Sequence, residues 1–438
     1  MTILERERTA SARRRMPIFA LFAANAISST GDILTFLAIP WFVLQTTGSV
    51  TQTGIPAFFS TISIAASAFF GSKVVDALGF RRASVVSDMM SAVAVAVIPL
   101  LYALGMLPFW VLLALVFLAG VFTTPGSTAR SALVPDLARL ADMRMERVTA
   151  AEDGITRISR FFGAPLAGVL IAVIGTSNLL WIDAATFAVS ALLIGLAVPH
   201  HVPAPPAAAP VDGATAGVPA APPRKSRYLA DLRAGVAFIW RDPVLVSLVA
   251  TVLVTNLLDA GIGSVLMPAY ILREFGSAVV LGSMVAIFGL TAFLGTVVYG
   301  AIGHRLPRRL TLGIGFTIGG APRVWVLALF PVVPLVLAAS AVAGFGIGPV
   351  NPIFGTITYE RVPTELRARV FGTVTAGAMA GMPLGGLLAG YCAGWLGLRG
   401  TLLAFGAVYF VATLSLLVNP AMRGIEPAKK VKASETAA

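Results

Sequence analysis

Long apolar segments follow one another along most of the chain and are separated by short polar breaks. Each segment has roughly 20 to 28 residues, which is enough for an α-helix to cross the hydrocarbon core of a bilayer. We therefore expect an all-α membrane protein with twelve transmembrane helices. The expected spans are 17–45, 50–75, 83–105, 108–134, 152–175, 178–198, 243–272, 276–303, 308–331, 332–358, 368–396 and 400–420.

The basic residues predict how these spans are oriented. If the N-terminus lies in the cytoplasm, 29 of the 32 Lys and Arg residues fall in or beside cytoplasmic stretches. Arg273 and Arg399 fall on the other side, and Arg323 falls within a span. This asymmetry follows the positive-inside rule and predicts both termini in the cytoplasm, with the protein in the inner membrane.

Composition agrees with a membrane protein and narrows its partners. Only 12% of the residues are charged, whereas about a quarter is usual in soluble proteins. The net charge of +12 is concentrated in the expected cytoplasmic stretches, where it would face anionic lipid headgroups, so we expect no nucleic-acid partner. The single cysteine, Cys392, excludes an intrachain disulfide and a cysteine-based zinc site, and we expect no metal.

A segment rich in proline and alanine divides the chain in two. Residues 199–227 contain eight prolines and predict an extended linker, and residues 228–242 predict an amphipathic helix on the cytoplasmic membrane face. The expected organisation is a basic cytoplasmic N-terminus (1–16), an N-terminal six-helix bundle (17–198), the linker with its amphipathic helix (199–242), a C-terminal six-helix bundle (243–420) and a cytoplasmic tail (421–438).

The two halves repeat one another. Asp32 precedes Pro40 by eight positions, and Asp259 precedes Pro268 by nine. The separations Ser49 to Asp76 and Ser277 to His304 are both 27 positions, and each is followed by a pair of arginines. Gly163–Gly168 also matches Gly381–Gly386. Such matches in register indicate an internal duplication, which is typical of transporters built from two six-helix halves.

The loop after the second expected span carries a recognisable motif. Its sequence from Gly71 to Arg82 resembles the loop signature of the major facilitator superfamily, and Gly300–Arg309 is a degenerate copy in the second half. The resemblance covers nearly the whole chain. It implies two pseudo-symmetric six-helix bundles and a cytoplasmic gate in which Asp76 contacts the region Glu365–Arg369. The implied gating-loop residues are Asp76, Gly79, Arg81, Arg82, His304, Arg308 and Arg309.

Three further stretches are similar to one branch of that superfamily. Ser29–Asp32, Trp240–Pro243 and Val362–Gly372 resemble the macrolide-efflux and siderophore-exporter branch of bacterial drug:proton antiporters. The resemblance implies a secondary transporter that exports small molecules in exchange for protons.

Two carboxylates in the middle of expected spans are the main candidates for chemistry. A charged side chain at mid-bilayer costs about 2.5–3.5 kcal/mol on insertion scales, so Asp32 and Asp259 are candidates for binding the coupling proton or a cationic substrate. The alternative is structural: Asp32 would then accept hydrogen bonds from Asn25, Ser28 or Ser29, and Asp259 would bond Asn256. The sequence does not say which of the two titrates.

Three other ionisable residues lie in or beside spans. Arg323 follows Pro322 and is either the countercharge of a buried carboxylate or a structural residue. Asp183 is expected to cap the start of the sixth span near the outer face. Asp88 is expected to join the cytoplasmic network of Asp76, Arg81 and Arg82.

Polar and glycine positions complete the candidates. Asn25, Gln52, Asn256 and Asn351 are possible polar contacts in the cavity. Gly163, Pro165, Gly381 and Pro383 are expected to act as hinge and packing elements. No phosphate-binding loop is present in the sequence, so we expect no cofactor and a proton gradient as the energy source.

The sequence thus predicts a proton-coupled exporter of amphipathic small molecules that works by alternating access as a monomer. Its partners would be the small-molecule substrate, protons and membrane lipids. A lysophospholipid or lipid translocator and a facilitator of the same fold remain alternatives. An intramembrane enzyme acting on lipid is a further alternative, but it would need clustered acid, base or nucleophilic groups near one interface, and the sequence shows none.

Overall fold

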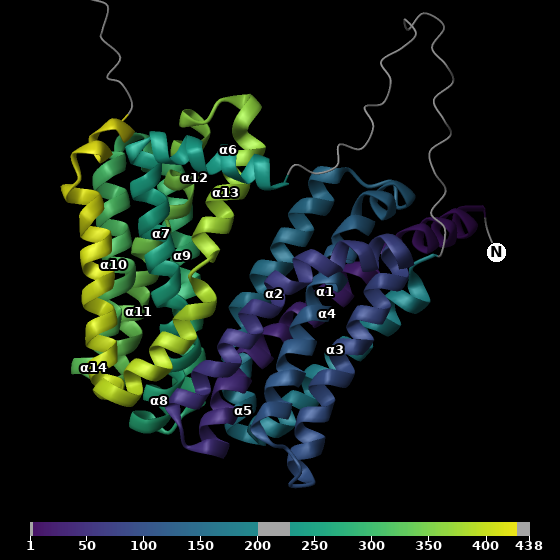
Figure 1. The fold of residues 1–438 in the computed structure, drawn as a ribbon. Helices are drawn as coiled ribbons and strands as arrows, with labels where there is room; N and C mark the ends of the chain where they lie inside the picture. Colours follow the sequence, from purple (N-terminus) through teal and green to yellow (C-terminus); the bar gives the residue numbers. More distant parts are fainter. Residues whose placement is uncertain (1–2, 200–227, 427–438) are drawn as a thin grey trace, which may run out of the picture. The chain divides into compact units, whose positions relative to one another are not determined.

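The structure is a computed structural model that describes residues 3–199 and 228–426. Most of the predicted linker and the last part of the predicted C-terminal tail lie outside the described residues. The described chain is helical throughout, and Figure 1 shows its helices as long rods.

The first half forms five continuous helical elements, of which the last contains a break. At Gly175 the backbone adopts φ 81° and ψ 163°, so α5 consists of two helices joined at this glycine. The first half therefore contains the six expected spans. The elements are α1 (Ile3–Thr47), α2 (Val50–Leu78), α3 (Phe80–Ala103), α4 (Phe109–Leu140) and α5 (Met145–Ala197).

The second half is interrupted more often. A π-helical segment, η1, links α7 to α8, and a second glycine break at Gly397 (φ 70°) divides α14. The elements are α6 (Tyr228–Arg241), α7 (Pro243–Gly261), η1 (Ile262–Leu266), α8 (Met267–Phe275), α9 (Ala278–Ile302), η2 (Gly303–Arg305), α10 (Arg308–Leu329), α11 (Val333–Ile347), α12 (Val350–Arg361), η3 (Thr364–Leu366), α13 (Arg367–Met379), α14 (Met382–Val418) and η4 (Pro420–Ile425).

The helices agree with the expected spans. Within the described residues, nine helical stretches are long and apolar enough to cross a membrane, and two of these contain the breaks at Gly175 and Gly397. The 29-residue helix α2 is the remaining expected span, which gives twelve. The stretch 308–358, the hardest to divide from hydropathy, is divided between Leu329 and Val333 as expected. Several helices extend beyond the apolar core; α4, for example, continues to Leu140.

The predicted amphipathic helix is present as α6 (Tyr228–Arg241), and its position on a membrane face stays a prediction. Its side chains divide: Ile239 is buried in a cluster with Val370 and Val374 of α13, whereas Trp240 is 73% exposed. Because α7 begins at Pro243, α6 is a helix of its own. Part of its apolar surface is therefore used for packing against protein, and only the remainder is available to a membrane surface.

By contacts the described chain divides into two compact units. One contains residues 3–199 together with Ala260–Ala286 and Met382–Leu398, and the other contains 228–259, Ile287–Gly381 and 399–426. In the first unit α1 packs mainly on α5, and α3 packs on α4 and α5. One apolar cluster of this unit joins α1, α4 and α5 and includes Ile18, Leu21 and Leu137.

Glycines bring helices of the two halves together inside the first unit. A Cβ added at Gly54 of α2 would lie 2.3 Å from the carbonyl oxygen of Gly386 in α14, and Thr51 Oγ1 donates a hydrogen bond to Gly390 O at 3.1 Å. Likewise, a Cβ at Gly282 of α9 would lie 2.5 Å from Ala164 O in α5. Small residues that let backbones approach are the usual means of packing membrane helices.

Replacement of Gly54 by alanine should therefore weaken this contact. A backbone carbonyl cannot move aside without a shift of the helix, so we expect a loss of about 1–3 kcal/mol, the range for overpacking. The apparent melting temperature of the detergent-purified protein measures the effect. Gly289→Ala is the matched control, because no atom lies within 4 Å of a Cβ there. Equal melting temperatures for the two variants would contradict the assignment of a tight contact.

Candidate functional site

A buried ion pair links α3 to α4 in the first half. Arg130 Nη1 donates to both carboxylate oxygens of Asp88 at 2.7 Å, and the Ser190 hydroxyl donates to Asp88 Oδ2 at 2.6 Å. Arg130 Nη2 also donates to the Ser28 hydroxyl of α1 at 3.3 Å. Both ionic side chains are at most 3% exposed. The expectation that Asp88 belongs with Asp76, Arg81 and Arg82 is therefore wrong, because its carboxylate turns into the bundle towards Arg130.

Asp32 lies beside this pair on α1 but is not part of it. Its side chain is half-buried and makes no hydrogen bond or ion pair within the described residues, and the charges acting on it are those of Asp183, Arg130 and Asp88. The structural alternative for Asp32 required a bond from Asn25, Ser28 or Ser29. Ser28 instead accepts from Arg130. Asp32 is thus a carboxyl group near mid-span with no partner among the described side chains.

Asp183 occupies a different place from the one expected. A side chain can cap a helix only from its first turn. The second helix of α5 starts after Gly175, and Asp183 lies beyond that first turn. It is fully buried and accepts a hydrogen bond from the Thr35 hydroxyl of α1, and its Oδ1 lies 3.1 Å from Thr186 Oγ1. The capping interpretation is therefore wrong, and Asp183 joins α5 to α1.

The carboxylate of the second half, Asp259 on α7, does have a cationic partner. Arg323 Nη2 of α10 donates to Asp259 Oδ1 at 2.9 Å, and Tyr409 Oη of α14 donates to Oδ2 at 3.3 Å. The guanidinium of Arg323 also stacks 4.5 Å from the centre of the Phe288 ring, a cation–π geometry. The Asp259 side chain is 38% exposed and that of Arg323 14%. Arg323 is therefore the countercharge of a carboxylate, one of its two sequence-based interpretations.

Asn256 was the expected structural partner of Asp259 and bonds elsewhere. Its amide donates to Ala378 O of α13 at 2.8 Å. The structural alternative for Asp259, as it was formulated from the sequence, is therefore wrong; a different structural role, as the partner of Arg323, takes its place.

The equivalent carboxylates of the two halves thus differ in their bonding partners. Asp32 and Asp259 occupy matching positions in the repeat, yet Asp259 forms an ion pair while Asp32 has no bonding partner among the described side chains. The arginine of the first half, Arg130, is used by Asp88 instead. The duplication preserved the two acidic positions, and the placement of the arginines made them chemically unequal.

The loop arginines hold the same position in both halves. Arg81 Nη2 donates to Gly195 O at the end of α5, and Arg309 Nη2 donates to Leu417 O at the end of α14. The two residues are equivalent in the repeat, five positions after Asp76 and His304 respectively. Each therefore ties the loop of its half to the last helix of that half.

The other gating-loop candidates lie at helix ends. Gly79 adopts φ 73° between α2 and α3, a conformation that favours glycine. Arg308 forms a bidentate ion pair with Glu360 at 2.7 and 3.0 Å. The exposed side chains are Asp76, Arg82 and His304. The side chain of Glu365, in the expected partner region of Asp76, lies outside the described residues, so the gate remains a prediction.

The remaining candidates are spread over the structure. Asn25 lines a small crevice with Arg130 and Glu152, whereas Gln52 lies in the first turn of α2 and Asn351 is exposed on α12. Helix α5 continues without a break through Gly163 and Pro165. In the second half, the helix is interrupted beside Gly381 and Pro383, between α13 and α14. A role of these positions as hinges remains a prediction.

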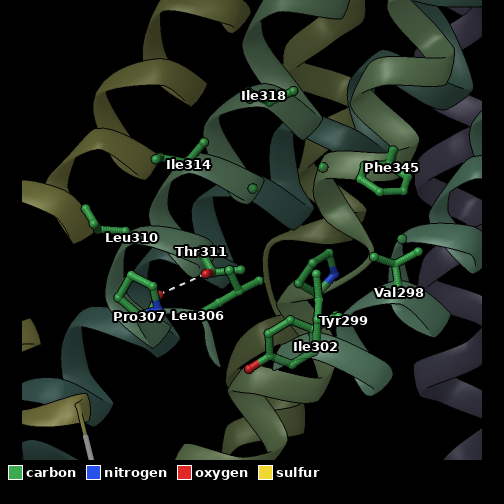
Figure 2. Close-up of a pocket in the computed structure, with 14 residues that line it drawn as sticks. Val298, Tyr299, Ile302, Leu306, Pro307, Leu310, Thr311, Ile314, Ile318 and Phe345 are labelled. Carbon is green, nitrogen blue, oxygen red and sulfur yellow. Dashed lines mark hydrogen bonds between the residues drawn. The ribbon is translucent and has the colours of Figure 1, made fainter. Parts of the chain in front are cut away.

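An apolar pocket lies in the second unit, away from these charges. It has a volume of about 360 Å³ and lies between α9, α10 and α11, where Val298, Ile314 and Phe345 contribute to its walls. Figure 2 shows Thr311, whose hydroxyl donates to the carbonyl of Pro307 at 2.8 Å. No charged residue lines this pocket, so it is not where a proton or a cation would be held.

Two of the site residues were missed in the sequence. Arg130 was counted with the basic cytoplasmic stretches although it falls within the expected span 108–134, and that position was the available signal. Tyr409 lies within the expected span 400–420 and had no distinguishing signal, because aromatic residues are common in membrane helices.

The fold and the paired charges inside it are those of a multi-pass secondary transporter. The Major Facilitator Superfamily profile matches residues 21–258 and 249–437, and the chain belongs to this family. The intramembrane enzyme is thereby set aside, because the family is one of transporters.

Curated relatives extend the comparison over the whole chain. The multidrug efflux pump Tap of Mycolicibacterium fortuitum is 30% identical over 421 residues, which cover 95% of this chain and 99% of the pump. Tap of Mycobacterium tuberculosis (strain ATCC 25618 / H37Rv) is 32% identical over 423 residues, covering 94% and 95%.

Solved structures agree on the fold. The nucleoside transporter NupG matches with a TM-score of 0.70 at 12% identity, covering 92% of this chain and 98% of its own. A bacterial homolog of the human lysosomal transporter Spinster, in an inward-facing and unoccupied conformation, matches with a TM-score of 0.64 at 15% identity, covering 95% and 99%. At these identities the matches support the fold alone.

Removal of one partner of the buried pair should destabilise the first half. Asp88→Asn would leave Arg130 charged and unpaired in a buried site, which costs about 3–5 kcal/mol. The matched control is Asp136→Asn, which breaks a solvent-exposed pair with Arg139 worth about 1 kcal/mol or less. The free energy of unfolding in mixed micelles measures both variants. Similar losses in the two would show that the Asp88–Arg130 pair is not isolated from solvent.

Proposed function

We propose that this protein is a proton-coupled exporter of amphipathic small molecules in the inner membrane of a bacterium, with both termini in the cytoplasm. It would work as a monomer by alternating access, in which its two halves expose a central site to either side of the membrane in turn. The observation that carries the proposal is the state of Asp32, a carboxyl group near mid-span without a bonding partner among the described side chains.

The carboxyl of Asp32 suits proton binding because nothing fixes its charge. An arginine beside a carboxylate favours its charged form and so opposes proton uptake. Asp88 and Asp259 are each bonded to an arginine, Arg130 and Arg323 respectively. Asp32 has no such partner among the described residues, so gain or loss of a proton changes the charge of the first half directly. Between the two candidates, we therefore assign the coupling proton to Asp32.

The same carboxylate gives a reason for exchange. Ionised Asp32 attracts a cationic or polarised substrate, and protonated Asp32 does not, so proton and substrate compete for one group. Proton uptake from the outside would release the substrate there, and proton loss to the cytoplasm would restore the charge for the next molecule. Asp259 and Arg323 form a neutral pair that contributes polar contacts, with Phe288 beside them.

The names of two relatives support a function in drug export. Both Tap proteins carry the name of multidrug efflux pumps and are similar to this chain over almost its full length. The membrane-embedded charges of this protein are few and largely paired, which suits amphipathic drug-like molecules better than sugars or phosphates. The finer resemblance, to the macrolide-efflux and siderophore-exporter branch, agrees with this substrate class.

The experiment is transport of a fluorescent lipophilic cation, ethidium, in proteoliposomes with an imposed pH gradient. We expect Asp32→Asn to reduce gradient-driven transport to the rate of protein-free vesicles, because the amide cannot take up a proton. Its melting temperature in detergent should match that of the wild type, which shows that the variant is folded. The matched control Asp136→Asn, on an exposed carboxylate, should keep full activity.

Other outcomes separate the alternatives. Gradient-driven transport by Asp32→Asn at the wild-type rate would refute the role of Asp32. Equilibration of ethidium by the wild type without any response to the pH gradient would indicate a facilitator. Transfer of a fluorescent lysophospholipid between leaflets, with no ethidium transport, would indicate a lipid translocator.

A further inference from the structure

The Asp183 carboxyl is sealed between two helices of the first half and has no cation beside it. Asp183 is 0% exposed, and no Lys, Arg or His side chain within the described residues forms an ion pair or a hydrogen bond with it. Both hydrogen-bonding partners of its carboxyl oxygens are hydroxyl groups. Oδ2 bonds the Thr35 hydroxyl on α1, and Oδ1 bonds the Thr186 hydroxyl one turn further along α5. Gly175 begins this helix, so Asp183 lies about 12 Å along it, at 1.5 Å per residue.

The close approach of α1 shows that the site is built for this carboxyl. A Cβ added at Gly31 would lie 2.2 Å from Asp183 Oδ1 and 2.1 Å from Thr186 Oγ1. No other residue type fits at position 31 without displacing one of the two side chains. Gly31 directly precedes Asp32, the proposed coupling residue, so the sealed site and the coupling site are carried by neighbouring positions of α1.

The two threonine hydroxyls of this site supply two hydrogens for three acceptor contacts. Thr186 has a single hydroxyl hydrogen and faces two acceptors, the backbone oxygen of Asp183 at 2.7 Å and Asp183 Oδ1 at 3.1 Å. The hydrogen points mainly to the nearer acceptor, the backbone oxygen of Asp183, which is the usual bond of a threonine within its own helix. With Asp183 ionised, the bond from Thr186 to Oδ1 is then the weaker branch of a shared hydrogen, whereas a proton on the carboxyl would make this contact a full hydrogen bond. Thr35 donates to the other oxygen, Oδ2.

The energetics agree with this count. A carboxylate buried without a countercharge is several kcal/mol less favourable than in water, and two hydroxyl donors do not restore its hydration. The neutral acid, in contrast, finds all its hydrogen-bonding needs met: one oxygen accepts from Thr35 and the hydroxyl of the acid donates to Thr186.

We propose that Asp183 is a resident proton-binding site: a neutral acid that clamps α1 to α5 through Thr35 and Thr186 and so positions Asp32. The site takes a proton and no larger ligand, because it is closed on all sides. Asp183 is a positioning residue in transport. This positioning role rests on the proposed function of Asp32, whereas the protonation of Asp183 does not.

The neutrality of Asp183 decides the charge around Asp32. The ionisable groups that act on Asp32 are Asp183 of α5, Asp88 of α3 and Arg130 of α4. Asp88 and Arg130 cancel as an ion pair. With Asp183 neutral, Asp32 is the one uncompensated carboxyl of this group. With Asp183 ionised, two carboxylates without countercharges would adjoin each other, and the midpoint of the pH profile would then report on both.

Infrared spectroscopy of the purified full-length protein tests the protonation directly. At neutral pH we expect the C=O stretching band of a protonated carboxyl in the wild type and in Asp32→Asn, and its loss in Asp183→Asn. The asparagine is nearly isosteric, with an oxygen for Thr35 and an amide hydrogen for Thr186, so the fold is retained. If Asp183→Asn instead removes a carboxylate band and leaves the C=O region unchanged, the proposal is overturned.

The pH profile of ethidium transport in proteoliposomes tests the consequence for Asp32. Asp183→Asn should keep transport and the wild-type midpoint, because one neutral group replaces another. A midpoint displaced to lower pH would show that a negative charge was removed beside Asp32 and would refute a neutral Asp183. Loss of transport by Asp183→Asn with the infrared result intact would overturn the positioning role, because it would show that the proton of Asp183 takes part in transport.

The clamp itself is tested with a hydroxyl deletion. Thr35→Val should lower the rate of gradient-driven transport and displace its pH midpoint, because α1 is no longer held to Asp183. Thr30→Val is the matched control, since the Thr30 hydroxyl bonds only the Ala26 carbonyl of its own helix at 2.8 Å. Identical profiles for the two variants would overturn the positioning role, independently of whether Asp32→Asn abolishes proton coupling.

Discussion

The structure depends on one constraint, the high free energy of an unpaired charge inside a membrane protein. This cost accounts for how the embedded ionic groups of the described chain are paired. Asp88 is paired with Arg130, and Asp259 is paired with Arg323, so each of these carboxylates has a countercharge beside it. Asp32, near mid-span, has neither a cation nor a hydroxyl bonded to it among the described residues. The constraint thus leaves Asp32 as the group whose charge is free to change.

The two halves derive from a duplication, but their embedded charges are no longer equivalent. Both halves inherited an acidic residue at the same position of their first helix, and both retained the loop arginine, Arg81 or Arg309, that binds the end of the last helix. The embedded arginines are not related in this way: Arg130 lies on α4, whereas Arg323 lies on α10. One half therefore contains a carboxylate paired with an arginine, and the other contains a carboxyl without a bonding partner among the described side chains.

Hydropathy predicted the spans well because membrane insertion is decided by local composition. The division between Leu329 and Val333 and the break near Gly175 both fell where the apolar runs paused. The depth of Asp32 and Asp259 followed from the same runs. The pairing partners did not, because they depend on how each helix is rotated. Asp88 and Arg130 are 42 positions apart, and nothing in the sequence shows that their side chains face one another. The capping role predicted for Asp183 was wrong because the helix starts after Gly175, and this start places Asp183 beyond the first turn.

Substrate-induced proton release tests the central claim most directly. Detergent-purified protein in weakly buffered solution with a pH indicator is mixed with ethidium, and the protons released per molecule are measured. The account predicts release from the wild type and from Asp259→Asn, and none from Asp32→Asn. Release that persists in Asp32→Asn, or that disappears in Asp259→Asn alone, would contradict it.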